Sequence, residues 1–425
     1  MVFAISLLSD LDNIKMAMRV RRRKRRSTSS SSSTNQKRHR ATLVAPYFSS
    51  VKWRSGPGVN IFRRKRTNDM LSRVSQFVFF VWGAMILVLH LFAESAPELP
   101  QCWMQVRPWI TKQPSCSLLV LDCHEVGIRG KTNEIAPQWS TFDPASVTRA
   151  VARHCPALEI PSTLASFSNL NAIKVYNSTI VSWDDSAALT HSSHPKLMTL
   201  FLVRVNVPDG RLPVGLHATD FPQSVGDIEF CYTNLRSLPD DIDTKWPQTG
   251  SIYIEASELE EVPAALTRLA PFDLSLSMNP ISELPAELFE QESIGYLSFG
   301  STLISQLPET VEALSSQLYE INLSYNNLSF FWPWIDPIIN RSEAPPLLLA
   351  GTPYCKNLEQ TFAKGFSVFS SVPSSSANNE KNSLLANISV SNWATLKKGV
   401  SCEDQDKTWY PIDFEDEYSS IVCAL

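Results

Sequence analysis

The segment Leu318-Tyr-Glu-Ile321-Asn-Leu323-Ser-Tyr-Asn326-Asn-Leu328 shows the pattern on which much of this 425-residue chain is built. Its apolar residues stand at positions one, four, six and eleven, and asparagine stands at position nine. Because successive side chains of a strand point to opposite faces, positions four and six predict the buried face of a short strand. The turn that follows carries position eleven into the same core.

The pattern occurs seven times. A second clear copy is Val225-Gly-Asp-Ile228-Glu-Phe230-Cys-Tyr-Thr233-Asn-Leu235. The copies are 27, 28, 24, 22, 23 and 24 residues apart, counted between their fourth-position residues Ile173, Leu200, Ile228, Ile252, Leu274, Leu297 and Ile321. Repeats of roughly 20 to 29 residues with this pattern are leucine-rich repeats. The sequence therefore predicts an α/β leucine-rich-repeat solenoid over residues 166–350, a horseshoe with short parallel strands on its concave face.

The second half of the repeat predicts an irregular convex side. Proline follows an apolar residue there and removes an amide that a regular helix needs. Such steps begin at Leu238, Val262, Leu284 and Leu307. Position nine holds asparagine only at Asn279 and Asn326, and serine or threonine replaces it in most other repeats. Val205 offers no hydrogen bond at that position, so we expect the second coil to be distorted.

The ends of a solenoid expose its core, so the flanking residues predict caps. We expect an N-terminal cap over residues 94–165, with an early strand at 119–126 and a helical segment at 144–154. We expect a C-terminal cap over residues 351–425, in which the Ser- and Asn-rich insert 370–382 forms a flexible loop.

All eight cysteines lie after residue 100 and predict disulfides formed in an oxidising compartment. The pairs Cys102–Cys116, Cys123–Cys155 and Cys355–Cys402 are plausible, although the sequence does not determine connectivity. Zinc held by Cys116, Cys123, His124 and Cys155 is an alternative, but the spacing matches no usual zinc site, so no metal is expected. Cys231 stands at strand position seven and is expected to be a free thiol.

Charge divides the chain after residue 76. Residues 1–76 contain 18 Lys and Arg against three acidic residues, a net charge of +15, and the remainder contains 20 basic and 39 acidic residues, or −19. Residues 1–76 therefore predict a disordered basic cytoplasmic tail, whose run at 21–26 lies near anionic lipid rather than nucleic acid. At the other end, Glu415, Asp416 and Glu417 are expected to keep the chain end soluble.

Residues 77–93 contain no charged side chain and predict a transmembrane signal anchor. As a helix they span about 25 Å, near the thickness of a thin bilayer. Basic residues precede them and Glu94 and Glu98 follow, so the positive-inside rule predicts a single-pass type II protein with residues 94–425 luminal or extracellular. A signal peptide cleaved near Ala93 is the rival, but 17 apolar residues exceed the usual 7–15 of such a segment.

The positions of the glycosylation sequons agree with this orientation in the membrane. All five lie after the apolar segment, at Asn177, Asn322, Asn327, Asn340 and Asn387. Their position argues against an organellar transit sequence at the N-terminus, and it predicts a glycoprotein domain beyond the membrane.

Four segments carry a resemblance to a known family: Leu121-Asp-Cys-His, Val175-Tyr-Asn-Ser-Thr-Ile180, Asp227-Ile-Glu-Phe-Cys231 and Phe330-Phe-Trp-Pro-Trp-Ile-Asp336. Together with the Leu-Pro steps, they resemble oomycete leucine-rich-repeat membrane proteins with receptor-like ectodomains. The resemblance implies a membrane-anchored repeat protein and implies no particular activity.

Positions five, seven and eight of each strand face the concave surface and predict where a partner binds. They present Tyr176, Phe201, Arg204, Tyr232, Tyr253, Glu255 and Tyr325. Aromatic side chains among charges are typical of protein interfaces, although aromatic residues also favour strands for packing reasons alone. We therefore expect a receptor-like protein that binds a protein or peptide, without a cofactor and with a possible co-receptor for signalling.

The sequence contains no recognisable catalytic motif, and we expect no enzyme activity. Two other functions fit the same residues. A solenoid released by cleavage near Ala93 would act as a soluble inhibitor or decoy, and a surface protein with weak multivalent contacts would serve a structural or adhesive role.

Overall fold

The computed structural model describes residues 61–95, 99–108, 113–248, 250–341, 344–364, 383–386 and 390–418. The predicted basic tail up to residue 60, the insert 370–382 and Asn387 lie outside the described residues. The described chain forms a helical unit and a repeat unit, and the strands all belong to the repeat unit.

The helical unit is α2 (Ile61–Glu94). Its 25 residues Met70–Glu94 contain an apolar stretch with a mean hydropathy of 2.1, which is not buried. A helix of that length spans about 37 Å, enough to cross a hydrocarbon core of about 30 Å. Length and composition support a membrane span only weakly, because a signal sequence has the same properties. Residues 61–76 are helical rather than disordered, since extending a formed helix gains a hydrogen bond for each residue fixed.

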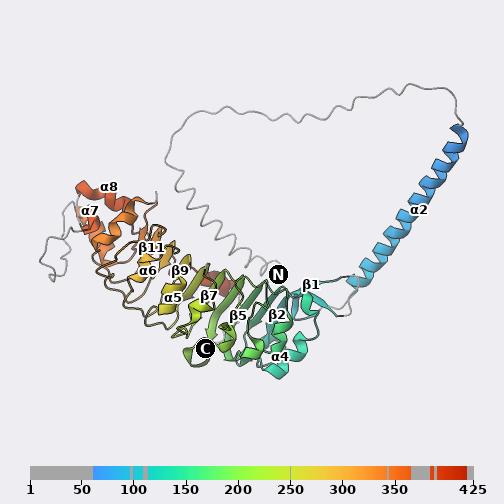
Figure 1. Ribbon diagram of the computed structural model, residues 1–425, viewed down its shortest axis with the longest axis horizontal. Coiled ribbons are helices and arrows are strands. Elements are labelled where there is room, and N and C mark those ends of the chain that lie inside the picture. Colours follow the sequence, from blue (N-terminus) through green and yellow to red (C-terminus); the bar gives the residue numbers. More distant parts are fainter. Residues whose placement is uncertain are drawn as a thin grey trace. The chain divides into compact units, whose positions relative to one another are not determined.

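The repeat unit is built on one open sheet whose strands follow one another along the unit (Figure 1). β1 (Cys102–Val106) is antiparallel to its neighbour, and the strands after it are parallel. These are β2 (Ser115–Asp122), β3 (Arg149–Arg153), β5 (Ala172–Ser182), β6 (Thr199–Asn206), β7 (Asp227–Thr233), β8 (Ser251–Glu255), β9 (Asp273–Ser275), β10 (Tyr296–Ser298), β11 (Glu320–Asn322), β12 (Leu347–Leu348) and β13 (Val400–Ser401). A short β4 (Leu158–Glu159) pairs with the far end of β5.

The strand register matches the repeat pattern. The fourth-position residues of the seven repeats pair with one another from Ile173 on β5 to Ile321 on β11. The side chains at positions four, six and eleven form one core, as Leu274, Leu276 and Ile281 show by being completely buried. Each such leucine contributes about 2 to 5 kcal/mol relative to alanine. The repeats predicted from spacing are therefore the structural coils.

The convex side consists of short helices and loops, as the Leu-Pro steps predict. The α-helices outside the sheet are α3 (Cys123–Val126), α4 (Thr132–Trp139), α5 (Ala264–Leu269), α6 (Glu287–Glu290), α7 (Pro353–Lys364) and α8 (Trp393–Gly399). A further helix, α9 (Ile412–Tyr418), does not belong to the convex side and lies against the strands β5 and β6. Short 3₁₀ helices fill other coils, for example Ser162–Ser166, Ile242–Thr244 and Pro333–Asn340. Buried tryptophans tie these loops together, as Trp246 does by donating its indole N–H to the carbonyl of Leu216 at 2.9 Å.

Position eight has left-handed backbone geometry in nine successive coils. The residues are His154, Asn177, Arg204, Tyr232, Ala256, Met278, Ser301, Tyr325 and Gly351, with φ between 42° and 72°. This geometry costs roughly 1 to 2 kcal/mol for a residue other than glycine. Hydrogen bonds from position nine offset the cost, since the Asn279 amide donates to the carbonyls of Ile254 and Leu276 and accepts from the Leu259 N–H.

The expected distortion at Val205 is not present. Val205 pairs with Ser178 on one side and Thr233 on the other, so the strand ladder continues beyond the left-handed residue. Backbone pairing replaces the missing side-chain hydrogen bond, and the Val205 side chain is fully buried.

The N-terminal cap contains a further coil. The segment predicted to be helical at 144–154 forms only a 3₁₀ turn at Pro144–Ser146, and the strand β3 follows it. Ala150 and Ala152 are buried and their neighbours on β3 are partly exposed, which is the alternation typical of a strand. The sequence did not reveal this strand because alanine is small and makes the alternation of apolar and polar residues hard to recognise. β3 lies between β2 and β5, and β12 and β13 extend the other end, so the sheet continues across residues 166 and 350.

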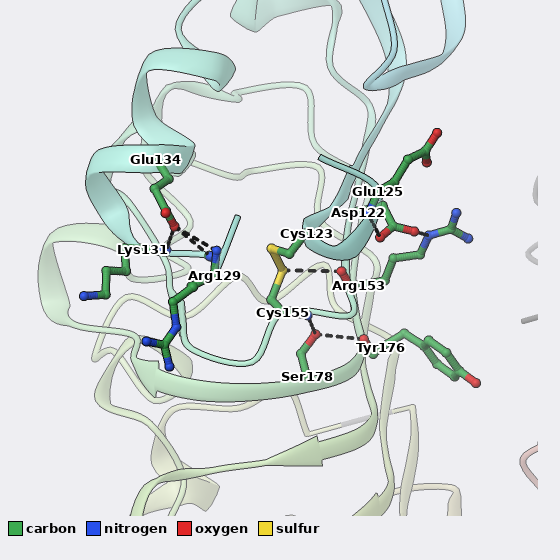
Figure 2. Close-up of a disulfide and its surroundings, with 11 residues drawn as sticks. Asp122, Cys123, Glu125, Arg129, Lys131, Glu134, Arg153, Cys155, Tyr176 and Ser178 are labelled. Atoms are coloured by element: carbon green, nitrogen blue, oxygen red, sulfur yellow. Dashed lines mark hydrogen bonds and ion pairs between the residues drawn. A yellow bond between two sulfur atoms is a disulfide. The ribbon is translucent and has the colours of Figure 1, made fainter. Parts of the chain in front are cut away.

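The six cap cysteines form Cys102–Cys116, Cys123–Cys155 and Cys355–Cys402. Because Cys116, Cys123 and Cys155 are all in disulfides, none of them has a thiolate to bind zinc, and the zinc alternative is wrong. Figure 2 shows Cys123–Cys155 inside the cap, with the Asp122–Arg153 ion pair at 2.7 Å on one side of it. On the other side, the Glu134 carboxylate accepts the backbone N–H groups of residues 129, 130 and 131 and shapes the loop.

Candidate functional site

Two rows of side chains line the concave face from β5 to β8. The position-five row pairs in register as Lys174, Phe201, Glu229 and Tyr253, and the position-seven row as Tyr176, Val203, Cys231 and Glu255. Each row has a basic or aromatic residue at the β5 end, and the carboxylate Glu255 lies at the β8 end. Neighbouring strands are about 4.8 Å apart, so this face extends for about 14 Å between β5 and β8.

The C-terminal segment of the chain covers these rows. We call residues 407–418 the C-terminal strap. After β13 at the far end of the sheet, the chain returns along the concave face, and the strap reaches β5 (Figure 1). Tyr176, Phe201 and Tyr253 are consequently only 5%, 8% and 8% exposed.

Glu255 holds the backbone of the strap. Its two carboxylate oxygens accept the N–H groups of Trp409 at 2.7 Å and Tyr410 at 2.9 Å, and the Ser275 hydroxyl also donates to it. The Glu255 side chain is completely buried. Hydrogen bonds to a buried carboxylate are roughly twice as strong as neutral ones, so this contact fixes the position and direction of the strap.

An apolar cluster holds the middle of the strap. Tyr410 and Ile412 pack with Tyr176, Phe201, Val203, Cys231 and Tyr253 as a second core, separate from the one inside the coils. The ring of Trp409 meets that of Tyr253 edge to face, with centroids 5.2 Å apart. Such aromatic pairs contribute about 0.5 to 1.5 kcal/mol beyond the area that they bury.

Basic side chains hold the acidic end of the strap. Arg204 makes a two-pronged contact with Asp416, with Nε at 2.9 Å from one carboxylate oxygen and an η nitrogen on the other. The Tyr176 hydroxyl donates to Asp416 at 3.0 Å. Lys174 pairs with Glu415 and donates to the Tyr410 hydroxyl at 2.9 Å. Glu415 is buried, so the expectation that this residue and Asp416 only solubilise the chain end is wrong.

Burial and nearby charges set the protonation of the groups at this contact. The hydrogen bond to Asp416 raises the pKa of Arg204, which therefore stays charged. Burial and the nearby Glu415 raise the pKa of Tyr410 well above its ordinary value, so its hydroxyl remains a donor to Glu415. Burial, followed by Glu255, raises the pKa of Cys231 in the same way, so its thiol is neutral while the strap covers it.

Two of the seven predicted binding residues lie at the margin of this face. Tyr232 is partly exposed and lies under Arg204, whose guanidinium carbon is 5.0 Å from the ring centroid. Tyr325 belongs to the coil of β11 farther along the sheet, where Lys407 approaches its ring at 6.0 Å. The other five, Tyr176, Phe201, Arg204, Tyr253 and Glu255, meet the strap directly or belong to its apolar cluster. Tyr232 packs against the edge of that cluster, and Tyr325 meets Lys407, the first residue of the strap.

Sequence reasoning missed the strap itself, and with it the roles of Lys174, Val203 and Cys231. A signal was available in the run Trp409-Tyr410-Pro411, which has two large aromatic residues close to the acidic end. Nothing local showed that this run returns across the sheet to meet β5.

The predicted glycosylation sites differ in accessibility. Asn177 is 5% exposed and its amide lies 3.0 Å from His154 Nδ1, and Asn322 is 2% exposed and donates to Ser298. Asn327 is exposed on the turn after β11. Among the residues that the structure describes, no group of three or more His, Cys, Asp or Glu side chains is placed to hold a metal ion.

No protein-family model matches the sequence, and no curated protein matches it. Among solved structures, the chain is similar to a leucine-rich repeat protein from Bacteroides eggerthii, with 14% identity over 59% of this chain and 43% of that one and a TM-score of 0.41. An internalin from Listeria monocytogenes shows 14% identity over 48% and 56%, with a TM-score of 0.36. The Toll–Spätzle complex of Drosophila shows 15% identity over 60% and 34%, with a TM-score of 0.38.

The chain spans between about a third and just over half of the length of these solved chains. The class of the protein follows from its own geometry: one parallel strand for each repeat, a core filled by positions four, six and eleven, and a left-handed residue at position eight. It is a leucine-rich-repeat solenoid with disulfides at both ends of its sheet, and its own C-terminal segment covers the concave face between β5 and β8.

Proposed function

We propose that this protein is a membrane-anchored, receptor-like recognition protein that binds a protein or peptide on the concave face between β5 and β8. The observation that carries the proposal is that this face holds a peptide segment in the structure. Glu255 accepts backbone N–H groups, Lys174 and Arg204 bind carboxylates, and aromatic rings line the space between them. Aromatic residues and arginine of this kind dominate protein interfaces.

The proposed topology is type II, with α2 as the anchor and the repeat unit luminal or extracellular. Disulfides in both caps support an oxidising compartment, and the basic residues before the apolar segment support a cytoplasmic N-terminus. The cytoplasmic tail would lie near anionic lipid, and signalling would pass through a co-receptor.

A secreted inhibitor or decoy is the second candidate, because residues 70–94 also satisfy the requirements of a signal sequence. The N-terminus of the mature protein, sequenced after expression in a eukaryotic cell, separates the two. We expect residues before Phe77 to be retained. A new N-terminus near Ala93 would show that the segment is cleaved, and would favour the secreted inhibitor or decoy over the membrane-anchored protein.

The binding surface is tested with a peptide display library on full-length protein whose strap is loosened by Trp409→Ala, Glu415→Gln and Asp416→Asn. The same triple variant with Arg204→Glu added is the matched control. We expect clones that bind the first protein and lose at least tenfold in affinity for the second. Clones that bind both equally would show that recognition uses another surface.

A further inference from the structure

We propose that the C-terminal strap is a tethered, displaceable ligand, and that the external partner is a peptide segment of the same chemistry: two aromatic residues followed, about five residues later, by two carboxylates. This inference deepens the proposed function and rests on it. It assigns the ligand class and a mechanism that keeps the face closed until a competing segment arrives.

The face has a fixed electrical polarity. The carboxylate of Glu255 on β8 accepts hydrogen bonds, so it binds donors. The cationic side chains of Lys174 on β5 and Arg204 on β6 bind acceptors, above all carboxylates. The strap satisfies both, because its consecutive N–H groups at Trp409 and Tyr410 meet the acid and its carboxylates meet the bases. A segment threaded in the opposite direction would place carboxylates against buried Glu255, which like-charge repulsion forbids.

The space between the two charged ends selects an aromatic side chain. The ring of Tyr410 is 3% exposed and lies among the aromatic rings of the sheet, and its hydroxyl meets Lys174 and Glu415. A tyrosine fits because its ring is apolar and its end is polar. Pro411 follows and has no N–H to leave unpaired, and Ile412 fills the remaining apolar space.

The strap is joined to the solenoid by a short tether. Cys402 is fixed to Cys355 on α7, and six residues separate it from Trp409. A short flexible tether gives an effective concentration in the millimolar range, so an external segment must compete with an intramolecular one.

The strap can leave without breaking the sheet. Strands β5 to β8 pair with neighbouring strands on both sides, and the strap meets them through the side chains of Lys174, Arg204 and Glu255. Its helix α9 has seven residues, too few to be stable alone. Asp413 and Glu417 remain exposed on its outer side. The strap is therefore a unit that opens locally, at a lower cost than unfolding the coils.

The first test measures binding of a labelled synthetic peptide, residues 408–418, to three proteins: the full chain, a chain ending at residue 406, and the full chain with Trp409→Ala, Glu415→Gln and Asp416→Asn. We expect the peptide to bind the second and third at least tenfold more tightly than the first. A peptide carrying the Glu415→Gln and Asp416→Asn changes should bind at least tenfold more weakly, whereas one with Glu417→Gln should bind as the parent does. Equal affinity for closed and opened proteins, or no binding to either opened protein, overturns the proposal.

The second test keeps the strap intact. Hydrogen exchange of the full chain compares the amides of Trp409 and Tyr410 with those of β7 and β8. We expect the strap amides to exchange at least tenfold faster, and to exchange faster still when the 408–418 peptide is in excess. Exchange of both sets at one rate, unaffected by the peptide, would show that the strap is an inseparable part of the fold.

A chemical reporter on the face supports the same measurement. Cys231 belongs to the cluster that Tyr410 and Ile412 cover, so in a Cys423→Ser background its alkylation reports strap opening. We expect the opened variants to react at least tenfold faster than the closed chain, and equal rates would contradict a strap that shields the face.

The two hypotheses fail separately. If the 408–418 peptide binds the opened protein but the display library yields no clone that depends on Arg204, the strap is a ligand for its own face and the proposed function fails. If the library yields such clones but they share no aromatic and acidic pattern and the 408–418 peptide does not bind, the face recognises partners and the tethered-ligand inference fails.

Discussion

At the scale of single residues, the contacts between coils are close enough that one methyl group matters. Gly250 has φ of +127°, and a Cβ at that residue would lie 2.3 Å from the carbonyl oxygen of Gly226. Both the backbone geometry and the space therefore require glycine. A Cβ at Gly226 would have no heavy atom within 4 Å apart from those of Gly226 and its two chain neighbours, so Gly226 offers a matched comparison one coil earlier.

We predict that Gly250→Ala lowers the free energy of unfolding by about 2 kcal/mol or more, because strain at such a φ alone costs about 1 to 3 kcal/mol. Gly226→Ala should change it by less than about 1 kcal/mol. Chemical denaturation of the two variants measures the difference. Equal stability would mean that the backbone between β7 and β8 relaxes without cost.

His194 links two coils on the convex side. Its Nε2 lies 3.0 Å from the carbonyl oxygen of Leu164, and its side chain is fully buried. Burial is the main cause that lowers the pKa of His194 below its ordinary value of 6.5, and the Leu164 carbonyl opposes it. Among the residues that the structure describes, its Nδ1 has no hydrogen-bond partner, so a second proton there would be left unpaired.

We predict a loss of stability on the acid side. Because the folded protein lowers the pKa of His194, its contribution is complete above pH 6.5 and is lost as the pH falls through the lowered pKa. The pKa values of His154 and His217 are lowered too, mainly by burial, and act in the same direction. Melting temperatures at a series of pH values from neutral to mildly acidic should fall less steeply for His194→Gln than for the parent. Identical slopes would assign the acid sensitivity to other groups.

At the scale of elements, each coil depends on its neighbours and each end depends on a crosslink. β3 has five residues, two of them alanines that contribute little to the core, and Cys123–Cys155 ties its end to α3. Gly130 lies against this disulfide, since a Cβ there would come within 3.2 Å of the Cys123 sulfur. The crosslink therefore compensates for a weak coil at the point where the solenoid begins.

We predict that replacing Cys123 and Cys155 together by serine lowers stability by about 3 to 4 kcal/mol, the loop-closure value for a separation of 32 residues. The loss should be local, with faster hydrogen exchange in β2 and β3 and little change in β9 to β11. Cys423→Ser, a cysteine-to-serine change outside this disulfide, is the control. Uniform faster exchange along the whole sheet would instead show that the solenoid unfolds as one cooperative unit.

At the scale of the whole molecule, accessibility decides which sequons can carry a glycan. Asn322 and Asn177 are buried and hydrogen-bonded, whereas Asn327 is exposed. We predict that Asn327→Gln removes part of the mass shift produced by N-glycan cleavage in a eukaryotic host, and that Asn177→Gln leaves it unchanged. The absence of any shift in the parent would contradict a luminal or extracellular repeat unit.

The sequence by itself determined the repeat architecture. Each coil is a local pattern in which positions four, six and eleven must be apolar to fill the core, so periodicity revealed the strands, their parallel order and the Leu-Pro convex side. The same reasoning placed Tyr176, Arg204 and Glu255 on the concave face. β3 escaped prediction because Ala150 and Ala152 give a weak alternating signal, and Val205 was misjudged because pairing between strands replaced a side-chain hydrogen bond.

Only the tertiary structure decided what covers the concave face. The ion pairs Lys174–Glu415 and Arg204–Asp416 join residues 241 and 212 positions apart, and Glu255 meets Tyr410 across 155. No local pattern encodes such a contact, because the strap meets the face only after every coil between β5 and β13 has stacked and set its direction. The repeats follow from short-range chemistry, whereas the closed surface follows from the return of the chain across its own sheet.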